Sequence, residues 1–171
     1  PARSAAAAHT ISPLRHGHPG RQYPATSIPY PYLCPMARIL SIDYGGKRTG
    51  IAVTDPLQII ATGLTTIESK ELIPFLKNYL LNEAVELIII GLPKNWNESA
   101  THGTPLAEAA IKKIKTAFPN TRLETVDERY TSKMARQAML DMGLKKKDRR
   151  DKKLVDEIAA TIMLQEYLGS Q

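Results

Sequence analysis

Acidic residues stand at three places in this 171-residue chain where a carboxylate could take part in a reaction. Asp43 follows the short apolar run 39–42, which is typical of a strand buried on both faces. The pair Asp127-Glu128 ends another apolar strand pattern, and Asp156 lies in the first turn of an apolar C-terminal helix. A carboxylate at the end of a buried strand costs free energy unless something positive meets it. These carboxylates are therefore expected to bind a cation.

Carboxylates that converge from three segments would repel one another and raise each other's pKa values. A divalent cation removes that penalty, and hard oxygen ligands suit Mg²⁺ or Mn²⁺. Two such ions about 3.5–4 Å apart activate a water and stabilise the leaving oxygen when a phosphodiester is cleaved. That chemistry also requires a basic surface for the backbone phosphates.

The basic residues that such a substrate needs are concentrated just ahead of Asp156. Lys47 and Arg48, in the turn after Asp43, would extend the same surface. If they contact phosphates, the affinity for nucleic acid should fall with salt; the other interpretation is a flexible, solvated loop. The basic residues ahead of Asp156 are Lys145, Lys146, Lys147, Arg149, Arg150, Lys152 and Lys153.

Each acidic position also has a purely structural interpretation. Asp43 could cap a turn, as Asp often does. The pair Asp127-Glu128 could form a charged turn that Arg129 neutralises, and only one of the two should face Asp43, because adjacent strand residues point to opposite faces. A carboxylate in the first turn of a helix, such as that of Asp156, is favoured by the helix dipole in any case. These alternatives stay open from the residues alone.

The hydrophobic pattern predicts the elements that must position these residues. Gly45-Gly46 is expected to connect the first two strands through a turn with positive φ, and Ser69 is expected to cap the first helix. The order predicts a mixed sheet, an antiparallel meander followed by parallel strands, with helices on both faces and a site at the carboxyl ends of the strands. The expected strands are 39–42, 49–54, an edge-like 61–67, 86–91 and 122–127, and the expected helices are 69–83, 104–118, 131–142 and 154–168, the last preceded by a charged loop over 144–153.

Composition limits the class of protein. The formal charge of +6 and the pI of about 9.4 make an anionic partner plausible. The single cysteine, Cys34, provides neither a disulfide framework nor a zinc-ligand set. No apolar run approaches the roughly 20 residues of a membrane span, so we expect a cytoplasmic protein without a membrane partner.

The first 35 residues differ from the rest of the chain. They hold seven of the twelve prolines and no Asp or Glu, and they show no periodicity. We therefore expect a disordered N-terminal extension over 1–35 and one domain over 36–171. Met36 reads as the natural start, with the extension arising from start-site assignment; a transit peptide is the alternative.

From Met36 to Leu168 the chain resembles the pre-16S ribosomal RNA nucleases, also called Holliday-junction-resolvase-like proteins (the YqgF family), of ribonuclease H-like fold. The resemblance implies a metal-dependent nuclease with one acid from each of three places: Asp43, the 127–128 pair with Glu128 favoured, and Asp156. The loop from Asn95 to Ser99 departs from the Asn-Met-Asp-Gly-Thr pattern usual in the family. The matching elements are Ile42-Asp43-Tyr44-Gly45 with Arg48-Thr49-Gly50-Ile51-Ala52-Val53, Gly91-Leu92-Pro93 with Asn95, Asp127-Glu128-Arg129 with Thr131, and Lys153-Leu154-Val155-Asp156 with Ala159-Ala160.

The resemblance favours precursor ribosomal RNA as the substrate, cut near the 5′ end of 16S, with branched DNA as the alternative and a monomer or weak homodimer as the expected state. Trp96, in the departing loop, would either stack on an unpaired base or pack against its own loop. A non-catalytic nucleic-acid-binding module would not need all three acids. An Asp-x-Gly hairpin also begins the actin- and sugar-kinase-like ATPases, but that fold needs a second related domain, for which the about 136 residues after residue 35 leave no room.

Overall fold

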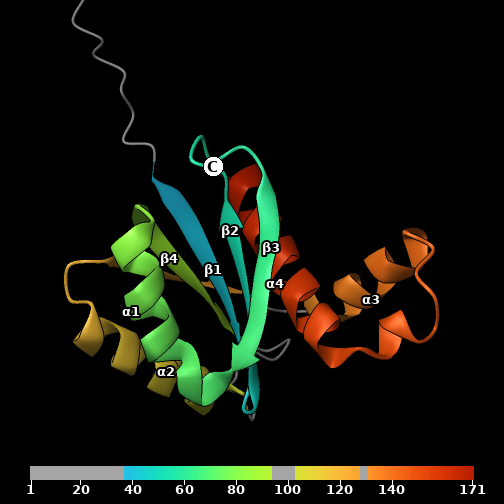
Figure 1. Cartoon of the computed structure of the whole chain (residues 1–171), viewed down its shortest axis with the longest axis horizontal. Helices are drawn as coiled ribbons and strands as arrows, with labels where there is room; N and C mark the ends of the chain where they lie inside the picture. Colours follow the sequence, from blue (N-terminus) through green and yellow to red (C-terminus); the bar gives the residue numbers. More distant parts are fainter. Residues whose placement is uncertain (1–36, 94–102, 128–130) are drawn as a thin grey trace, which may run out of the picture. The chain divides into compact units, whose positions relative to one another are not determined.

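The structure is a computed structural model that describes residues 37–93, 103–127 and 131–171. The extension expected over 1–35 lies outside these residues and stays a prediction. Figure 1 shows the described elements along the chain. They are β1 (Arg38–Tyr44), β2 (Arg48–Thr54), β3 (Ala61–Glu68), the 3₁₀ turn η1 (Ser69–Glu71), α1 (Leu72–Asn82), β4 (Val85–Leu92), α2 (Thr104–Ala117), β5 (Arg122–Asp127), α3 (Thr131–Asp141), the 3₁₀ turn η2 (Asp148–Arg150) and α4 (Lys152–Gly169).

The five strands form one mixed sheet in the order β3-β2-β1-β4-β5. β1 pairs antiparallel with β2, and β2 pairs antiparallel with β3. β4 lies parallel to β1 on one side and to β5 on the other. The predicted meander followed by parallel strands is confirmed, including the edge position of β3, and this arrangement is the ribonuclease H-like fold that the family resemblance implied.

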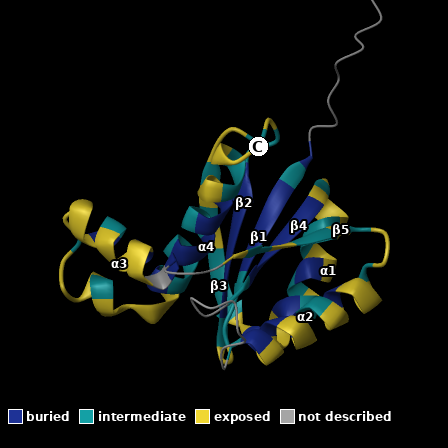
Figure 2. Ribbon diagram, turned by 180° about the vertical axis from the view of Figure 1, so that it is seen from behind, coloured by how far each residue is buried: buried dark blue, intermediate teal, exposed yellow. Residues whose placement is uncertain are grey.

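Helices cover both faces of the sheet, with α1 and α2 on one face and α4 on the other (Figure 2). The alternation along β1 assigns its side chains to these faces. Leu40 and Ile42 are fully buried in the core beneath α1 and α2, whereas Ile39 is buried against α4. The buried run in β4 is divided in the same way, which is why both central strands read as continuous apolar stretches.

Small residues allow α4 to lie close to the sheet. Ala160 is fully buried, and its carbonyl oxygen accepts a hydrogen bond of 3.0 Å from the Ser41 hydroxyl on β1. Near the C-terminal end of the helix, the Tyr167 hydroxyl donates to Glu124 of β5 at 2.8 Å. None of the described helices, α4 included, is long and apolar enough to cross a membrane.

Two predictions about local structure were wrong. Ser69 does not cap a helix; its hydroxyl donates to the Gly45 carbonyl oxygen at 2.6 Å and accepts from Thr49 at 3.0 Å, so it ties the β3 end to the hairpin. Gly45 and Gly46 do form the hairpin turn, but neither has a positive φ. Gly45 is needed there for space, since a Cβ would lie 2.7 Å from the Arg48 carbonyl oxygen.

The charged segment before the last helix is shorter than predicted. α4 begins at Lys152, two residues before the expected start, and Asp151 caps it by accepting a 2.9 Å hydrogen bond from the Lys153 backbone N–H. The segment 148–150 forms a 3₁₀ turn instead of open loop. Lys152 and Lys153 are therefore held in the first helical turn, next to Asp156.

Candidate functional site

Asp43 and Asp156, 113 residues apart in sequence, line the same cavity, which has a volume of about 550 Å³. The cavity lies at the carboxyl end of β1, where sites gather in sheets of this kind. Its walls come from the β1–β2 turn, the start of α4 and the residues that flank the segment 94–102. The structure thus brings together two of the three acidic positions that the sequence singled out.

The alternation of β1 explains why Asp43 is directed toward α4. Ile39 packs on the α4 side of the sheet, and Ser41 bonds to the helix backbone. Asp43 is two residues further along the same strand and so lies on the same face. It is half-buried at the last but one position of β1, paired with Gly50 of β2.

Two glycines set the position of Asp156. A Cβ placed on Gly50 would lie 2.0 Å from the Asp156 carbonyl oxygen, so the first turns of α4 rest directly on the bare backbone of β2. On β3, a Cβ on Gly63 would lie 2.5 Å from the Glu157 carboxylate. The Thr66 hydroxyl fixes the same end of the helix by donating to the Lys153 carbonyl oxygen at 2.7 Å.

Arg48 contacts Asp156 directly. Its Nε donates to Asp156 Oδ2 at 2.7 Å, and about a third of the Arg48 side chain and a quarter of the Asp156 side chain are exposed. Arg48 and Gly50 are two residues apart on β2 and therefore share the face that α4 covers. The glycine that admits the helix and the arginine that holds its carboxylate thus come from one strand.

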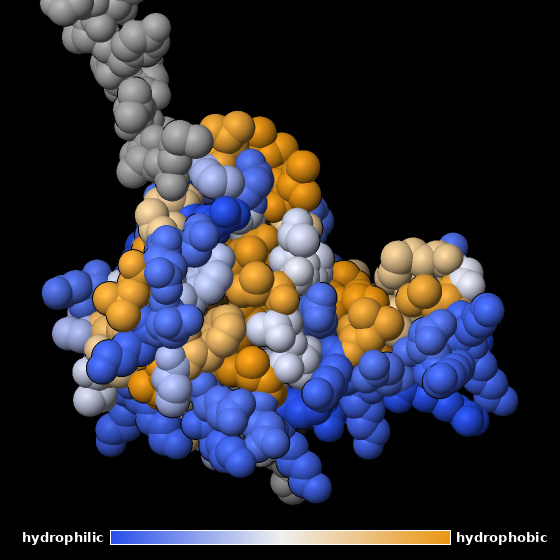
Figure 3. Space-filling view, viewed as in Figure 1, coloured by the Kyte–Doolittle hydropathy of each residue, from blue (hydrophilic) through white to orange (hydrophobic). Residues whose placement is uncertain are grey.

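Positive charge surrounds the two carboxylates. Lys47, Arg48 and Lys152 line the same cavity, so three cations stand against two carboxylates. The remaining basic residues ahead of α4 are exposed apart from the half-buried Arg149, whose guanidinium donates to the Leu144 carbonyl oxygen at 3.0 Å. Hydrophilic side chains cover much of the surface over α3 and the start of α4 (Figure 3).

Of the third acidic position, the pair Asp127-Glu128, the structure describes only Asp127. Asp127 is exposed, ends β5 beside Leu92 and does not line the cavity. Other predicted site residues lie outside the described part of the chain, and their roles stay predictions. They are Glu128, Arg129, Asn95 and Trp96.

The residues at the cavity fit a hard divalent cation in kind. Asp43 and Asp156 supply carboxylate oxygens, the ligands that Mg²⁺ and Mn²⁺ prefer, and Mg²⁺ in proteins often uses only one or two carboxylates and keeps waters. Within 37–93, 103–127 and 131–171 no group of three His, Cys, Asp or Glu residues could hold a metal ion.

Sequence reasoning did not find the glycines, and it placed Arg48 beside Asp43 and on the phosphate-binding surface, not against Asp156. Glycine inside a strand pattern is a known signal of a close backbone approach, so Gly50 and Gly63 carried a usable signal. The hydrogen bond between Arg48 and Asp156 joins residues 108 positions apart, and the sequence around either residue does not predict it.

Comparison with known proteins gives consistent results. The model of the RuvX family, described as Holliday junction resolvase, matches residues 37–170. A protein of Flavobacterium psychrophilum named "putative pre-16S rRNA nuclease" is 58% identical over 133 residues, covering 78% of this chain and 97% of the relative. A protein of the same name from Bacteroides thetaiotaomicron is 54% identical over 136 residues, covering 80% and 99%.

Among solved structures, RuvC of T. thermophilus in complex with a Holliday junction substrate is 14% identical to this chain. The match covers 78% of this chain and 94% of that one, with a TM-score of 0.47. The family match and the two relatives all span nearly the whole described part of the chain, and on those matches the chain belongs to the RuvX family.

Proposed function

We propose that this protein is a metal-dependent endonuclease that hydrolyses phosphodiester bonds in the 5′ maturation of pre-16S ribosomal RNA. One observation carries the proposal: Asp43 and Asp156, from the first strand and the last helix, line one cavity together with three cationic side chains. The names of the relatives support the substrate, since both are called pre-16S rRNA nucleases. A protein with that substrate would work in the cytoplasm, where ribosomes are assembled, as a monomer or weak homodimer.

In this proposal Asp43 and Asp156 hold Mg²⁺ or Mn²⁺, with Glu128 as the third ligand. When bound, such an ion activates water and stabilises the leaving oxygen of a phosphodiester. Glu124 and Val126 both face α4. Glu124 accepts the hydrogen bond from Tyr167, and Val126 packs against the core beneath that helix. Alternation then turns Asp127 to the opposite face, which supports its neighbour Glu128 over Asp127 itself.

The remaining residues of the cavity bind and orient the substrate. Arg48 fixes one oxygen of Asp156, Oδ2, and leaves Oδ1 for a ligand bond. Lys47 and Lys152, which line the cavity, bind phosphate oxygens of the substrate through their ammonium groups. The exposed basic segment 145–150 extends this surface along the nucleic acid, and Asn95, Trp96 and Arg129 are proposed to join it.

The test is a cleavage assay on the full chain with two substrates, a precursor 16S rRNA 5′ segment and a four-way DNA junction. Each is incubated with Mg²⁺, with Mn²⁺ and with chelator. Asp43→Asn and Asp156→Asn should abolish metal-dependent cutting of the RNA. Asp141→Asn on α3, an exposed aspartate away from the cavity, is the matched control and should cut at the parent rate.

The other outcomes separate the alternatives. Cutting of the junction and not of the RNA would assign the substrate to branched DNA, the activity in the description of the family model. Salt-sensitive binding without cutting under either metal would replace the nuclease by a non-catalytic nucleic-acid-binding module. Comparing Asp127→Asn with Glu128→Gln then decides the third ligand, because only the ligand's variant should lose activity.

A further inference from the structure

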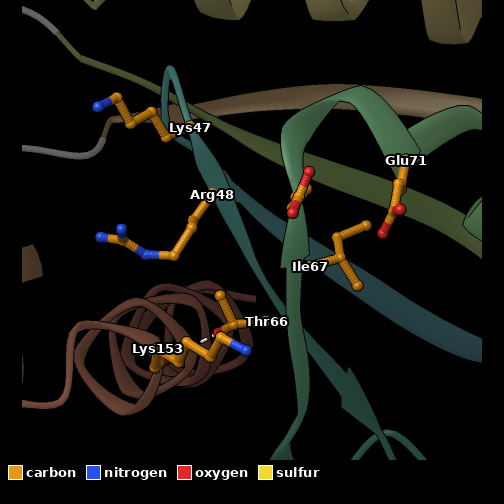
Figure 4. A pocket seen from close by; sticks show the side chains of 7 residues that line it. Lys47, Arg48, Thr66, Ile67, Glu71 and Lys153 are labelled. Carbon is orange, nitrogen blue, oxygen red and sulfur yellow. Dashed lines mark hydrogen bonds between the residues drawn. The ribbon is translucent and has the colours of Figure 1, made fainter.

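A second pocket, of about 580 Å³, lies next to the carboxylate cavity and shares Lys47 and Arg48 with it. Figure 4 shows it between the start of β2, the end of β3 and the first turn of α4. Thr66 and Lys153 form its base in that view, and Ile67 supplies an apolar wall. Of the residues that line this pocket, the proposed chemistry uses only Lys47 and Arg48, which the two pockets share.

Two lysines that line the pocket form no salt bridge with any described residue. Within the described residues, neither Lys47 nor Lys153 takes part in a salt bridge, whereas Arg48 is held by Asp156. Of the two acidic residues lining the pocket, Glu68 is paired with Lys70 at 2.6 Å; this bond and, to a smaller extent, the charge of Lys153 lower the pKa of the Glu68 carboxyl. The net unpaired charge is therefore positive on the side that adjoins the carboxylate cavity.

The other acidic residue, Glu71, lies on the side opposite Lys47 and Arg48 (Figure 4). An anion would be repelled from that side and drawn toward Lys153 at the base of the pocket and Lys47 at the side opposite Glu71. The pocket thus has a defined orientation for a ligand with one anionic and one neutral end, such as a nucleotide unit.

The pocket is built in advance of any ligand. The Thr66 hydroxyl fixes the Lys153 backbone at 2.7 Å, and Gly50, opposite Thr66 in the β2–β3 ladder, carries the helix turn that follows Lys153. Only the lysine side chains have to be ordered when an anion binds, which keeps the entropic cost of binding low.

We propose that this pocket binds a backbone phosphate of a nucleotide that flanks the cleaved bond, so that the substrate strand passes from the carboxylate cavity across Lys47 and Arg48 to Lys153. This inference rests on the proposed function and names how that site extends along its substrate. The volume lies within the range of small-ligand sites and accommodates one nucleotide unit. Lys153 supplies the charge for the phosphate, and Ile67 the apolar contact for the sugar or base.

The test measures binding by the full-length Asp43→Asn protein, which should hold its substrate uncut. Fluorescence anisotropy gives the affinity for single-stranded RNA and DNA oligomers in which the phosphates are replaced, one at a time, by neutral methylphosphonates. Adding Lys153→Gln should lower the slope of log affinity against log salt by about 0.7, the value of one phosphate contact on a single strand. At one position of the oligomer, a methylphosphonate should weaken binding to the Asp43→Asn protein but should not affect binding to the protein that also carries Lys153→Gln.

Controls separate charge from structure. Lys153→Arg should restore both the salt slope and the sensitive position. Lys77→Gln, an exposed lysine on α1 outside both pockets, should change neither.

The inference is overturned if Lys153→Gln keeps the parent slope, or if every methylphosphonate acts equally in both proteins. Failure of the proposed function would appear elsewhere, as absence of cutting by the unsubstituted chain. A protein that bound no oligomer of either kind would overturn both.

Discussion

Replacing Gly50 by alanine should displace the start of α4 and damage the site. A Cβ at this position would lie 2.0 Å from the Asp156 carbonyl oxygen and 2.5 Å from its carbon, both backbone atoms of α4. Ordinary van der Waals contact begins at 3.4 Å, so the first turns of the helix would have to move away by more than 1 Å. A backbone cannot swing aside as a side chain does, and the displacement would carry the Asp156 carboxylate with it.

The expected cost follows from that displacement. Overpacking of a tight contact typically costs about 1–3 kcal/mol of stability, and we expect Gly50→Ala to fall at the upper end. A misplacement of about 1 Å in a reacting group costs roughly 100-fold in rate. Cleavage should therefore fall about 100-fold even under conditions in which the variant is fully folded.

Gly63→Ala is the matched control, because it adds the same methyl group against the same helix turn. Its Cβ would lie 2.5 Å from the Glu157 carboxylate oxygen and 2.7 Å from Glu157 Cγ, both atoms of a side chain that can change rotamer without moving the helix backbone. We expect its stability to change by no more than about 0.5 kcal/mol and its cleavage rate to stay near that of the parent.

Urea unfolding monitored by circular dichroism gives the midpoints, and a constant m-value confirms that only stability has changed. Single-turnover cleavage of the precursor RNA with excess Mg²⁺ gives the rate. The reasoning is refuted if Gly50→Ala matches the parent in both measurements, or if Gly63→Ala loses as much as Gly50→Ala.

Three further predictions concern charge. Arg48→Lys and Arg48→Gln should both lower the cleavage rate, because neither can repeat the Nε bond to Asp156, while stability should fall by no more than about 1 kcal/mol for this partly exposed pair; only Arg48→Lys should keep the RNA affinity. Hydrogen bonds from the backbone N–H of Ile60 and of its neighbours lower the pKa of Asp55 in the folded protein. The ionised carboxylate therefore stabilises the fold at any pH above 3.8, its ordinary pKa, and this stabilisation is lost as the pH falls through the lower pKa of the folded protein. Asp55→Asn should therefore unfold at lower urea than the parent at neutral pH, with the difference closing in acid. Replacing the three lysines of 145–147 by glutamine should reduce the salt slope of RNA binding by about 0.7 for each phosphate that a lysine had neutralised, as measured by anisotropy.

The fold was predictable from the sequence because its central strands are buried on both faces. The apolar runs around Ile42 and Ile89 are short, rich in β-branched residues and followed by glycines, which favours buried strands, and the mixed parallel and antiparallel pairing followed from the order of elements. The local errors occur where tertiary contacts override local preference. Ser69 would be a good helix cap in isolation, but its hydroxyl bonds to the hairpin turn, which the sequence places 24 residues away.

The candidate site was predictable to the extent that strand alternation reaches it. Asp43 follows Ile39 and Ser41 on one face, so its direction could be derived once the strand was known. Asp156 required the helix to be placed on the correct face, and its bond to Arg48 could not be derived at all from either segment alone. No alternating pattern continues through 94–102, so the sequence offers no basis for directing Asn95 or Trp96.

The alternation that builds the core also builds the site. On β2, Ile51 and Val53 are buried beneath α1 and α2, which leaves Arg48, Gly50 and Ala52 on the side that α4 covers. A slip of one residue in the register of β2 would exchange the two faces, burying the arginine and presenting a branched side chain where the helix needs bare backbone. The β2 register that buries the apolar core therefore also places Gly50 beneath Asp156 and the Arg48 guanidinium beside the Asp156 carboxylate. By this argument, a substitution that shifts the β2 register should displace Asp156, the proposed metal ligand, and disrupt the core together, whereas Gly50→Ala should mainly displace Asp156.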